Sequence, residues 1–206
     1  MLELLMPRRC VLCRTEGTAL CGSCATSLPA APDLAAPPGL AHCWSLLTYE
    51  GTTKDLVAAL KFHNHRDAAH LLGTAMARLV DPDLVTRLDV ISWAPTSAGR
   101  RRRRGYDQAE LLARSVAQHL GLPCRSTLER SAGAAQAGHG REERLHGPQF
   151  RSRPPAPARV VLVDDVRTTG ATLCSAADTL TGAGATEVVG LTLAVTLGPG
   201  QAATSA

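Results

Sequence analysis

The sequence predicts an α/β protein in which a parallel sheet flanked by helices follows a small cysteine-rich ribbon. Short Val-rich apolar runs alternate with segments whose apolar residues recur at helical spacing. The central run ends in two aspartates and a turn rich in Thr and Gly. Four cysteines in two Cys-x-x-Cys pairs stand near the N-terminus.

The composition fits one α/β domain with a small appendage, at 206 residues, 45% hydrophobic and 19% charged. Arginine dominates the net charge of +4, because only Lys54 and Lys61 among the 22 basic residues are lysines. Aromatic residues make up 3% of the chain, so any binding of nucleic acid is expected to depend on charge rather than on stacking.

No stretch approaches the run of about 18 apolar residues that a membrane span needs, so no membrane partner is expected. The apolar start of the chain lacks the features of a signal peptide, since its arginines follow the apolar run. We therefore expect a cytoplasmic protein, whose seven cysteines bind metal or stay as thiols. Cys43, Cys124 and Cys174 stand alone among apolar neighbours and are expected to pack as small hydrophobes.

Residues 1–28 predict a zinc ribbon with four cysteine ligands. Cys10 and Cys13 form one pair, Cys21 and Cys24 the other, and four thiolates so spaced suit tetrahedral zinc. With all four ligands from the protein, no position is open for a catalytic water, so the zinc would be structural. It would hold a segment too short to bury a core of its own. The alternative is a reduced pair of turns without metal.

The elements follow in order after the ribbon. Residues 29–42 are rich in Pro and Ala and predict a linker, residues 43–198 carry the α/β pattern, and residues 199–206 predict a disordered tail. Val-rich or apolar runs predict strands at 43–49, 88–93, 160–163 and 187–195. Helical periodicity predicts helices at 53–61, 71–80 and 108–120, and a fourth through 173–180. Pro82 ends the second helix and Gly121 the third.

The segment from Arg159 to Thr172 organises the chain. An apolar strand delivers Asp164 and Asp165 at its carboxyl end, which is the edge where open α/β sheets bind ligands. The Thr/Gly turn then opens a helix, whose unpaired amides form a cradle for phosphate. Carboxylates accept from hydroxyls and amides donate to phosphate, so the pattern predicts a ligand such as ribose 5-phosphate. The alternative is an acid pair that only caps the helix.

This stretch closely resembles the phosphoribosyl-diphosphate (PRPP) motif of type I phosphoribosyltransferases: a hydrophobic strand, two acids, any two residues, then Thr-Thr-Gly-Ala-Thr. In that family the acids hold the ribose hydroxyls and the loop holds the 5-phosphate. The resemblance assigns the first role to Asp164 and Asp165. It assigns the second to Thr168, Thr169, Gly170, Ala171 and Thr172.

A run of arginines from 100 to 104 follows the second predicted strand and the loop 94–97. A loop at the carboxyl edge of that strand would lie beside the acids, so we expect Arg102, Arg103 and Arg104 to face the diphosphate of the ligand. The alternatives are a solvated basic turn and nonspecific binding of nucleic acid.

The arginine run and the Arg-Gly-Tyr-Asp-Gln sequence after it resemble the ComF branch of the phosphoribosyltransferases, competence-associated proteins that begin with a Cys-x-x-Cys ribbon. That branch commonly shows Val-Pro-Val-Pro where this chain has residues 91–95, and Arg-Gly-Phe-Asn-Gln where it has residues 104–108. The resemblance extends to Leu60-Lys61-Phe62.

Two polar segments are expected to be loops. His63 and His65 have no acid or cysteine at ligand spacing, so we expect a solvated or substrate-edge turn there rather than a metal site. Residues 130–150 predict a long loop, a lid or a disordered segment. Arg130, Gln136, Arg144 and Phe150 match the family pattern in it.

Two functional hypotheses follow from the resemblance. The first is a phosphoribosyltransferase that binds PRPP or a related ribose phosphate with Mg²⁺ and transfers the phosphoribosyl group. Mg²⁺ prefers diphosphate oxygens and water to an all-protein cage. The second is an adaptor of DNA uptake that senses a nucleotide-like ligand and contacts single-stranded DNA or a helicase. The sequence leaves the oligomeric state open, with a homodimer as one arrangement.

Overall fold

The computed structural model describes residues 8–62, 66–131 and 148–198. Its strands are β1 (Cys43–Thr48), β2 (Val90–Trp93), β3 (Leu128–Arg130), β4 (Phe150–Ser152), β5 (Arg159–Arg167) and β6 (Glu187–Val195). Its helices are α1 (Gly22–Thr26), α2 (Gly51–Phe62), α3 (Arg66–Ala77), α4 (Pro82–Val85), α5 (Ala98–Arg104), α6 (Gln108–Leu120) and α8 (Ala171–Gly182). Within these residues, no helix has the length and apolar character that crossing a membrane requires.

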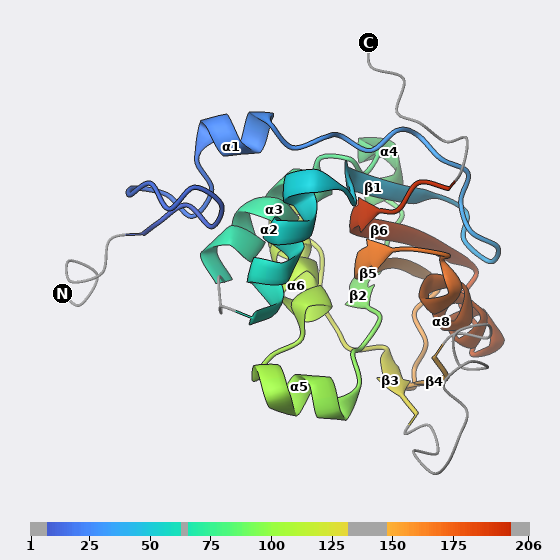
Figure 1. Cartoon of the computed structure of the whole chain (residues 1–206). Coiled ribbons are helices and arrows are strands. Elements are labelled where there is room, and N and C mark those ends of the chain that lie inside the picture. Colours follow the sequence, from blue (N-terminus) through green and yellow to red (C-terminus); the bar gives the residue numbers. More distant parts are fainter. Residues whose placement is uncertain (1–7, 63–65, 132–147, 199–206) are drawn as a thin grey trace.

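Four parallel strands form the central sheet in the order β1-β6-β5-β2 (Figure 1). The two inner strands, β5 and β6, pair along their whole length, from Arg159 opposite Glu187 to Arg167 opposite Val195. Both read as apolar runs because helices cover both faces of such a sheet. The predicted fold class, a parallel sheet flanked by helices, is confirmed.

The helices lie in two layers on opposite faces of the sheet (Figure 1). Helices α2, α3 and α6 share a core with Val161 and Val163 of β5, whereas α8 packs with Val160 and Leu162 of the same strand. The alternation of these four residues is the period of two that a strand imposes. The acids near the carboxyl end of β5 therefore lie between two helical layers.

Two predictions about local structure were wrong in detail. The predicted loop of arginines is helix α5, because the Ser97 side chain caps its start at 3.4 Å from the Arg100 amide nitrogen and Gly105 closes its end with a φ of 81°. Arginine is also a good helix former. Strand β5 continues through both acids to Arg167 rather than ending before them.

The predicted loop at 130–150 begins and ends in strands: β3 and β4 pair as an antiparallel ribbon, with Arg130 opposite Phe150. Residues 132–147, including Gln136 and Arg144, lie outside the described residues, as do His63, His65 and the predicted tail at 199–206.

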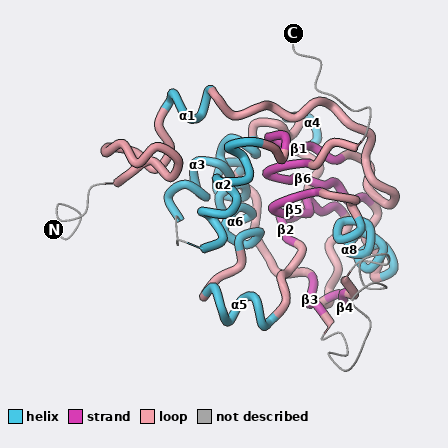
Figure 2. The backbone as a smooth tube through the Cα atoms, in the orientation of Figure 1, coloured by secondary structure: helices cyan, strands magenta, loops and turns pink. Residues whose placement is uncertain are grey.

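The segment between α1 and β1, drawn as loop in Figure 2, is held against the sheet. The amide of Thr48 donates to Pro29, and that of Ala31 donates to Leu46, so residues 29–31 lie beside β1. Further along, a Cβ built on Gly170 would lie 3.0 Å from Cγ of buried Pro37. The predicted linker thus reaches the loop that opens α8.

Candidate functional site

Strand β5 and helix α8 build the centre of the candidate site. Asp164 and Asp165 are half-buried, and the Asp165 amide donates to Oδ1 of Asp164 at 2.8 Å. Gly170 begins α8 in the left-handed region, with a φ of 82°, which favours glycine. The chain therefore turns sharply within a few residues of the acids, and the start of α8 faces the same edge of the sheet.

A cavity of about 280 Å³ lies at this edge. Its walls come from the carboxyl ends of β2 and β5, from α5 and from the starts of α6 and α8, with Tyr49 after β1 and Lys61 at the end of α2. Because all strands of the sheet are parallel, their carboxyl ends meet here. The acids, the Thr/Gly loop and the arginine helix thus share one cavity.

Acidic and basic side chains line the cavity together. Nζ of Lys61 lies 2.8 Å from Oδ2 of Asp165, and both side chains are about one-fifth exposed, at 23% and 22%. Arg100, Arg104 and Arg130 also line the cavity. Such a mixture of fixed charges suits a ligand that combines phosphate groups with hydroxyls.

Asp164 is the most perturbed acid of the site. Burial, and next the neighbouring Asp165 carboxylate, raise the pKa of Asp164 well above its usual range. Two carboxylates this close resist double ionisation, so a bound cation or hydroxyl donor would favour the charged form of the pair.

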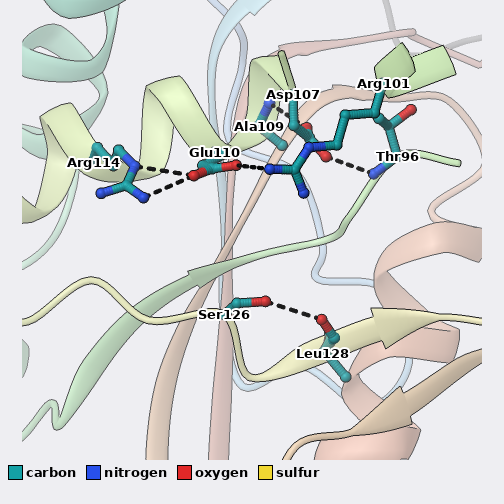
Figure 3. Close-up of polar contacts among 8 residues, drawn as sticks. All are labelled: Thr96, Arg101, Asp107, Ala109, Glu110, Arg114, Ser126 and Leu128. Carbon is teal, nitrogen blue, oxygen red and sulfur yellow. Dashed lines mark hydrogen bonds and ion pairs between the residues drawn. The ribbon is translucent and has the colours of Figure 1, made fainter. Parts of the chain in front are cut away.

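Asp107 braces part of the cavity wall through its contacts with Thr96 and Ala109 (Figure 3). Its carboxylate accepts from the Thr96 amide at 2.8 Å and from the Ala109 amide at 3.1 Å, so it joins the loop after β2 to the start of α6. Burial raises the pKa of Asp107, although the amide hydrogen bonds oppose this effect. This acid therefore has a positioning role in the cavity wall.

Only one of the three predicted arginines lines the cavity. Arg104 faces it together with Arg100, one helical turn earlier, whereas exposed Arg102 and Arg103 are not among its lining residues. Arg101 lies 3.8 Å from Glu110, which also pairs with Arg114 (Figure 3). The helical periodicity of α5 divides the run into a cavity side and a solvent side.

Gln108 adds an amide to the cavity wall. Nη1 of Arg104 donates to Oε1 of Gln108 at 2.8 Å, and since guanidinium has only donors, this contact fixes which end of the amide is oxygen. The residue is 5% exposed, and its Nε2 has no hydrogen-bond partner among the described residues.

The loop predicted to hold phosphate is divided in a similar way. Thr168 and Thr172 line the cavity, whereas Thr169, Gly170 and Ala171 do not. The Thr169 hydroxyl accepts from the Ala171 amide at 3.3 Å and so shapes the turn.

Several lining residues were not assigned from the sequence, among them Lys61, Asp107 and Gln108. Lys61 and Gln108 lie in segments that carry the family resemblance, which was the available signal. Arg100 belonged to the predicted run, and placing that run on a helix would have put it on the same face as Arg104, because residues four apart share a face.

The four predicted cysteine ligands come together as the sequence predicts. The sulfur atoms of Cys10, Cys13, Cys21 and Cys24 all lie within 4.8 Å of one another, and the Cys13 and Cys21 sulfurs are 3.6 Å apart. A tetrahedron with metal–sulfur bonds of about 2.3 Å has sulfur–sulfur edges of about 3.8 Å. The cluster therefore fits a metal ion.

The pKa values of two thiols of the cluster shift in opposite directions, for different reasons. Burial opposes ionisation of Cys10, but the amides of Cys21, Cys13 and Leu12 outweigh it and lower the pKa of this thiol to about 6. The side chains of Cys21 and Cys13 raise the pKa of Cys24 to about 12. Four thiolates need a cation to offset their charge, which is the role of a structural metal.

The parallel sheet, the acid pair in β5 and the Thr/Gly loop before α8 define a type I phosphoribosyltransferase-like fold. The chain is 29% identical to the DNA utilization protein YhgH of Salmonella typhi and of Salmonella typhimurium, over 197 residues that cover 87% of this chain and 85% of each relative. The resemblance to the ComF family is thereby confirmed. No family model matches the chain.

Solved structures with a similar fold include three enzymes. An allosteric regulatory enzyme of purine biosynthesis is 23% identical over 62% of this chain, with a TM-score of 0.42, and the glutamine PRPP amidotransferase of B. subtilis is 25% identical over 61%, with 0.41. This chain spans 26% of the length of each. The orotate phosphoribosyltransferase of Aeropyrum pernix is 18% identical over 60% of this chain and 69% of its own, with 0.35.

Proposed function

We propose that the cavity binds phosphoribosyl diphosphate with Mg²⁺ and that the protein transfers the phosphoribosyl group to an acceptor base. One observation carries this proposal: two acids, the Thr/Gly loop and the arginines of α5 line a single cavity at the carboxyl edge of the sheet. The acids suit ribose hydroxyls, Thr168 and Thr172 suit the 5-phosphate, and Arg100 and Arg104 suit the diphosphate.

Transfer of the phosphoribosyl group requires that the protein position the two substrates, and it requires no covalent nucleophile from the protein. The bond from the anomeric carbon to a diphosphate oxygen breaks, the diphosphate leaves with the electron pair, and a nitrogen of the acceptor forms the new bond. Arginine side chains would stabilise the charge that grows on the leaving diphosphate. Mg²⁺ would be held chiefly by diphosphate oxygens, with a carboxylate of the acid pair nearby.

The double variant Asp164→Asn/Asp165→Asn is expected to weaken the binding of PRPP and Mg²⁺ strongly while leaving the fold intact. A hydrogen bond to a charged group is worth about 1.5 to 3 kcal/mol, so the loss should be tenfold or more. Stability should change little, since the variant also removes a buried carboxylate with a raised pKa. Titration calorimetry and thermal melting measure the two quantities.

Asp55→Asn is the matched control, because Asp55 is an exposed acid on α2 away from the cavity lining. Affinity that is equal in all three proteins would mean that the acid pair only shapes the turn. Release of diphosphate with a panel of nucleobases tests turnover, and the acid-pair variant should lose it.

We further propose that the four-cysteine cluster holds one Zn²⁺ with a structural role. The donor set is all sulfur and comes entirely from the protein, so no position is left for a catalytic water. Val11 and Ala19 of this ribbon are buried in the core that contains α3, and Arg8 lies 3.2 Å from Asp67 of that helix. Metal binding would thus stabilise a segment that packs on the main domain.

A second candidate function is favoured by the solvent side of α5. Arg102 and Arg103 are exposed beside Arg101, and a relative of this chain is named a DNA utilization protein. A row of exposed guanidinium groups suits phosphates of single-stranded DNA, which would be bound by charge. This function is compatible with ligand binding in the cavity on the other side of the helix.

The two sides of α5 are expected to separate in mutagenesis. Arg100→Ala/Arg104→Ala should weaken PRPP binding about tenfold or more and affect ribose 5-phosphate much less, since only PRPP carries a diphosphate. Arg102→Ala/Arg103→Ala should instead lower the affinity for a labelled single strand. It should also flatten the salt dependence by about 0.7 in log–log slope for each lost phosphate contact.

Each double variant is the control for the other, because both remove two arginines from the same helix. Loss of discrimination between the two sugar phosphates in the Arg102/Arg103 variant would contradict the assignment. Unchanged DNA affinity in that variant would remove the second function.

A further inference from the structure

The ion pair between Lys61 and Asp165 lies inside the proposed ligand site. Nζ of Lys61 is 2.8 Å from Oδ2 of Asp165, and both residues line the cavity. Asp165 belongs to the acid pair that would accept the ribose hydroxyls, so one of its oxygens is already engaged. A ligand that needs this oxygen has to compete with a cation supplied by the protein itself.

Lys61 is well placed to move between partners. It stands at the end of α2, and the preceding Leu60 carbonyl accepts from the Tyr106 hydroxyl at 2.6 Å, which ties this end of α2 to the turn between α5 and α6. The backbone is thus fixed, whereas the lysine side chain has a flexible four-carbon stem. Its ammonium group is a point charge, so a phosphate oxygen can take the place of the carboxylate as its partner.

Exchange of Asp165 for a ligand phosphate as the partner of Lys61 is favourable only for ligands that supply such a phosphate. Arg104 already donates to Gln108, so the cavity offers Lys61 as a further cation for a ligand with two adjacent phosphates. A ligand with only a 5-phosphate, which the Thr168 and Thr172 loop would hold, offers Lys61 no new partner in exchange for Asp165.

We propose that Lys61 is a specificity-determining residue, an internal counter-ion of Asp165 that a ligand's diphosphate draws away. This inference rests on the proposed function and adds a selection step to it. PRPP supplies the phosphate oxygens that replace the carboxylate as the partner of Lys61, and Asp165 then becomes available to a ribose hydroxyl. Ribose 5-phosphate has to break the ion pair without this compensation.

Lys61→Met tests the proposal through effects of opposite sign. Methionine keeps much of the length of the stem without the charge, so Asp165 is released while the cation is lost. Affinity for ribose 5-phosphate should rise, and affinity for PRPP with Mg²⁺ should fall, so that the ratio of the two changes about tenfold or more. Lys54→Met is the control, because Lys54 is the other lysine of the chain and is exposed on the same helix.

A spectroscopic readout follows the lysine signals of the wild-type protein, and substitutions serve only to assign them. Reductive methylation with ¹³C-formaldehyde keeps the lysine charge and labels both lysines and the N-terminus. Lys61→Arg and Lys54→Arg assign the signals. Adding PRPP with Mg²⁺ should shift the Lys61 signal and leave the Lys54 signal in place, and ribose 5-phosphate should shift the Lys61 signal much less.

The outcomes distinguish this inference from the proposed function. Wild-type protein that binds neither sugar phosphate overturns the proposed function. Two results would overturn only the role of Lys61 in a wild-type protein that binds PRPP. One is that Lys61→Met changes the affinities for PRPP and for ribose 5-phosphate by the same factor. The other is that the Lys61 signal does not shift when PRPP is added. Lys61 would then be a structural ion pair.

Discussion

Cys21→Ser is expected to release the metal of the ribbon and to lower the stability of the whole chain. Each ligand lost from a four-thiolate site removes much of the binding energy, which in such small sites amounts to about 10 to 16 kcal/mol and is also folding energy. The ribbon cannot keep its shape without the metal, because it is too short to bury a core. Elemental analysis of purified protein should fall from about one zinc per chain to none.

The stability loss should be visible outside the ribbon. Val11 and Ala19 are buried against the domain, so an unfolded ribbon exposes apolar surface on both sides of this contact. Burial of a Val side chain is worth about 1.5 to 3 kcal/mol, which corresponds to a decrease in melting temperature of about 3 to 12 °C for a chain of this size.

Cys124→Ser is the matched control, since Cys124 is a half-buried thiol that belongs to no cluster among the described residues. It should keep the zinc and melt close to the wild-type temperature. Freshly purified, reduced wild-type protein that contains no metal would contradict the zinc proposal. A Cys21→Ser protein that melts like wild type would show that the ribbon is independent of the domain.

The parallel sheet could be predicted because each of the two inner strands is recognisable from its own apolar run in the sequence. β6 was predicted with the bounds that the structure has, and β5 was recognised from four apolar residues in a row. Residues 160–163 of β5 are fully buried and all apolar, and β6 is buried from Val188 to Val195 with Thr192 as its polar side chain. Strands covered on two faces carry such apolar runs, so no competing pattern is present. The cysteine cluster was equally predictable, because ligand spacing in a short segment is a direct geometric constraint.

The cavity wall was less predictable because it depends on contacts between segments far apart in the chain. The pairing of Lys61 with Asp165 spans helix α2 and strand β5, and nothing in either segment alone encodes it. The arginine run was predicted to be a loop, because five identical residues in a row show where charge lies but not which of them share a helix face. Only the cap at Ser97 and the turn at Gly105 decide which arginines face the cavity.

Two departures from the ComF pattern make sense in the structure. Tyr106 stands where that branch has Phe, and its hydroxyl donates to the Leu60 carbonyl, a contact that Phe lacks. Asp107 stands where the branch has Asn, and its carboxylate accepts from two amides, at Thr96 and Ala109. An Asn side chain has one oxygen for these two donors. Both changes thus fasten the same turn, between α5 and α6, to its surroundings.

Gly170→Ala is expected to disturb the proposed phosphate loop more than any other single methyl group added to a loop glycine. Its φ of 82° costs a non-glycine residue about 1 to 2 kcal/mol. A Cβ there would also lie 3.0 Å from Cγ and 3.1 Å from Cβ of Pro37, which is buried and belongs to a stiff ring. Denaturation by urea should show a loss of about 2 to 3 kcal/mol, and PRPP binding should fall with it.

Gly105→Ala separates the two causes of this loss, because Gly105 has nearly the same φ, 81°, but a Cβ there would meet nothing within 4 Å. It should lose only the backbone strain. The excess loss in Gly170→Ala measures the contact with Pro37, and Pro37→Ala should relieve part of it, giving a double-mutant coupling of about 0.5 kcal/mol or more. Equal losses at the two glycines, with PRPP affinity unchanged, would show that the segment between ribbon and sheet does not support the loop. A positive coupling would mean that Pro37 stays in place against residue 170, so that the segment leading from the cysteine ribbon packs on the proposed phosphate loop.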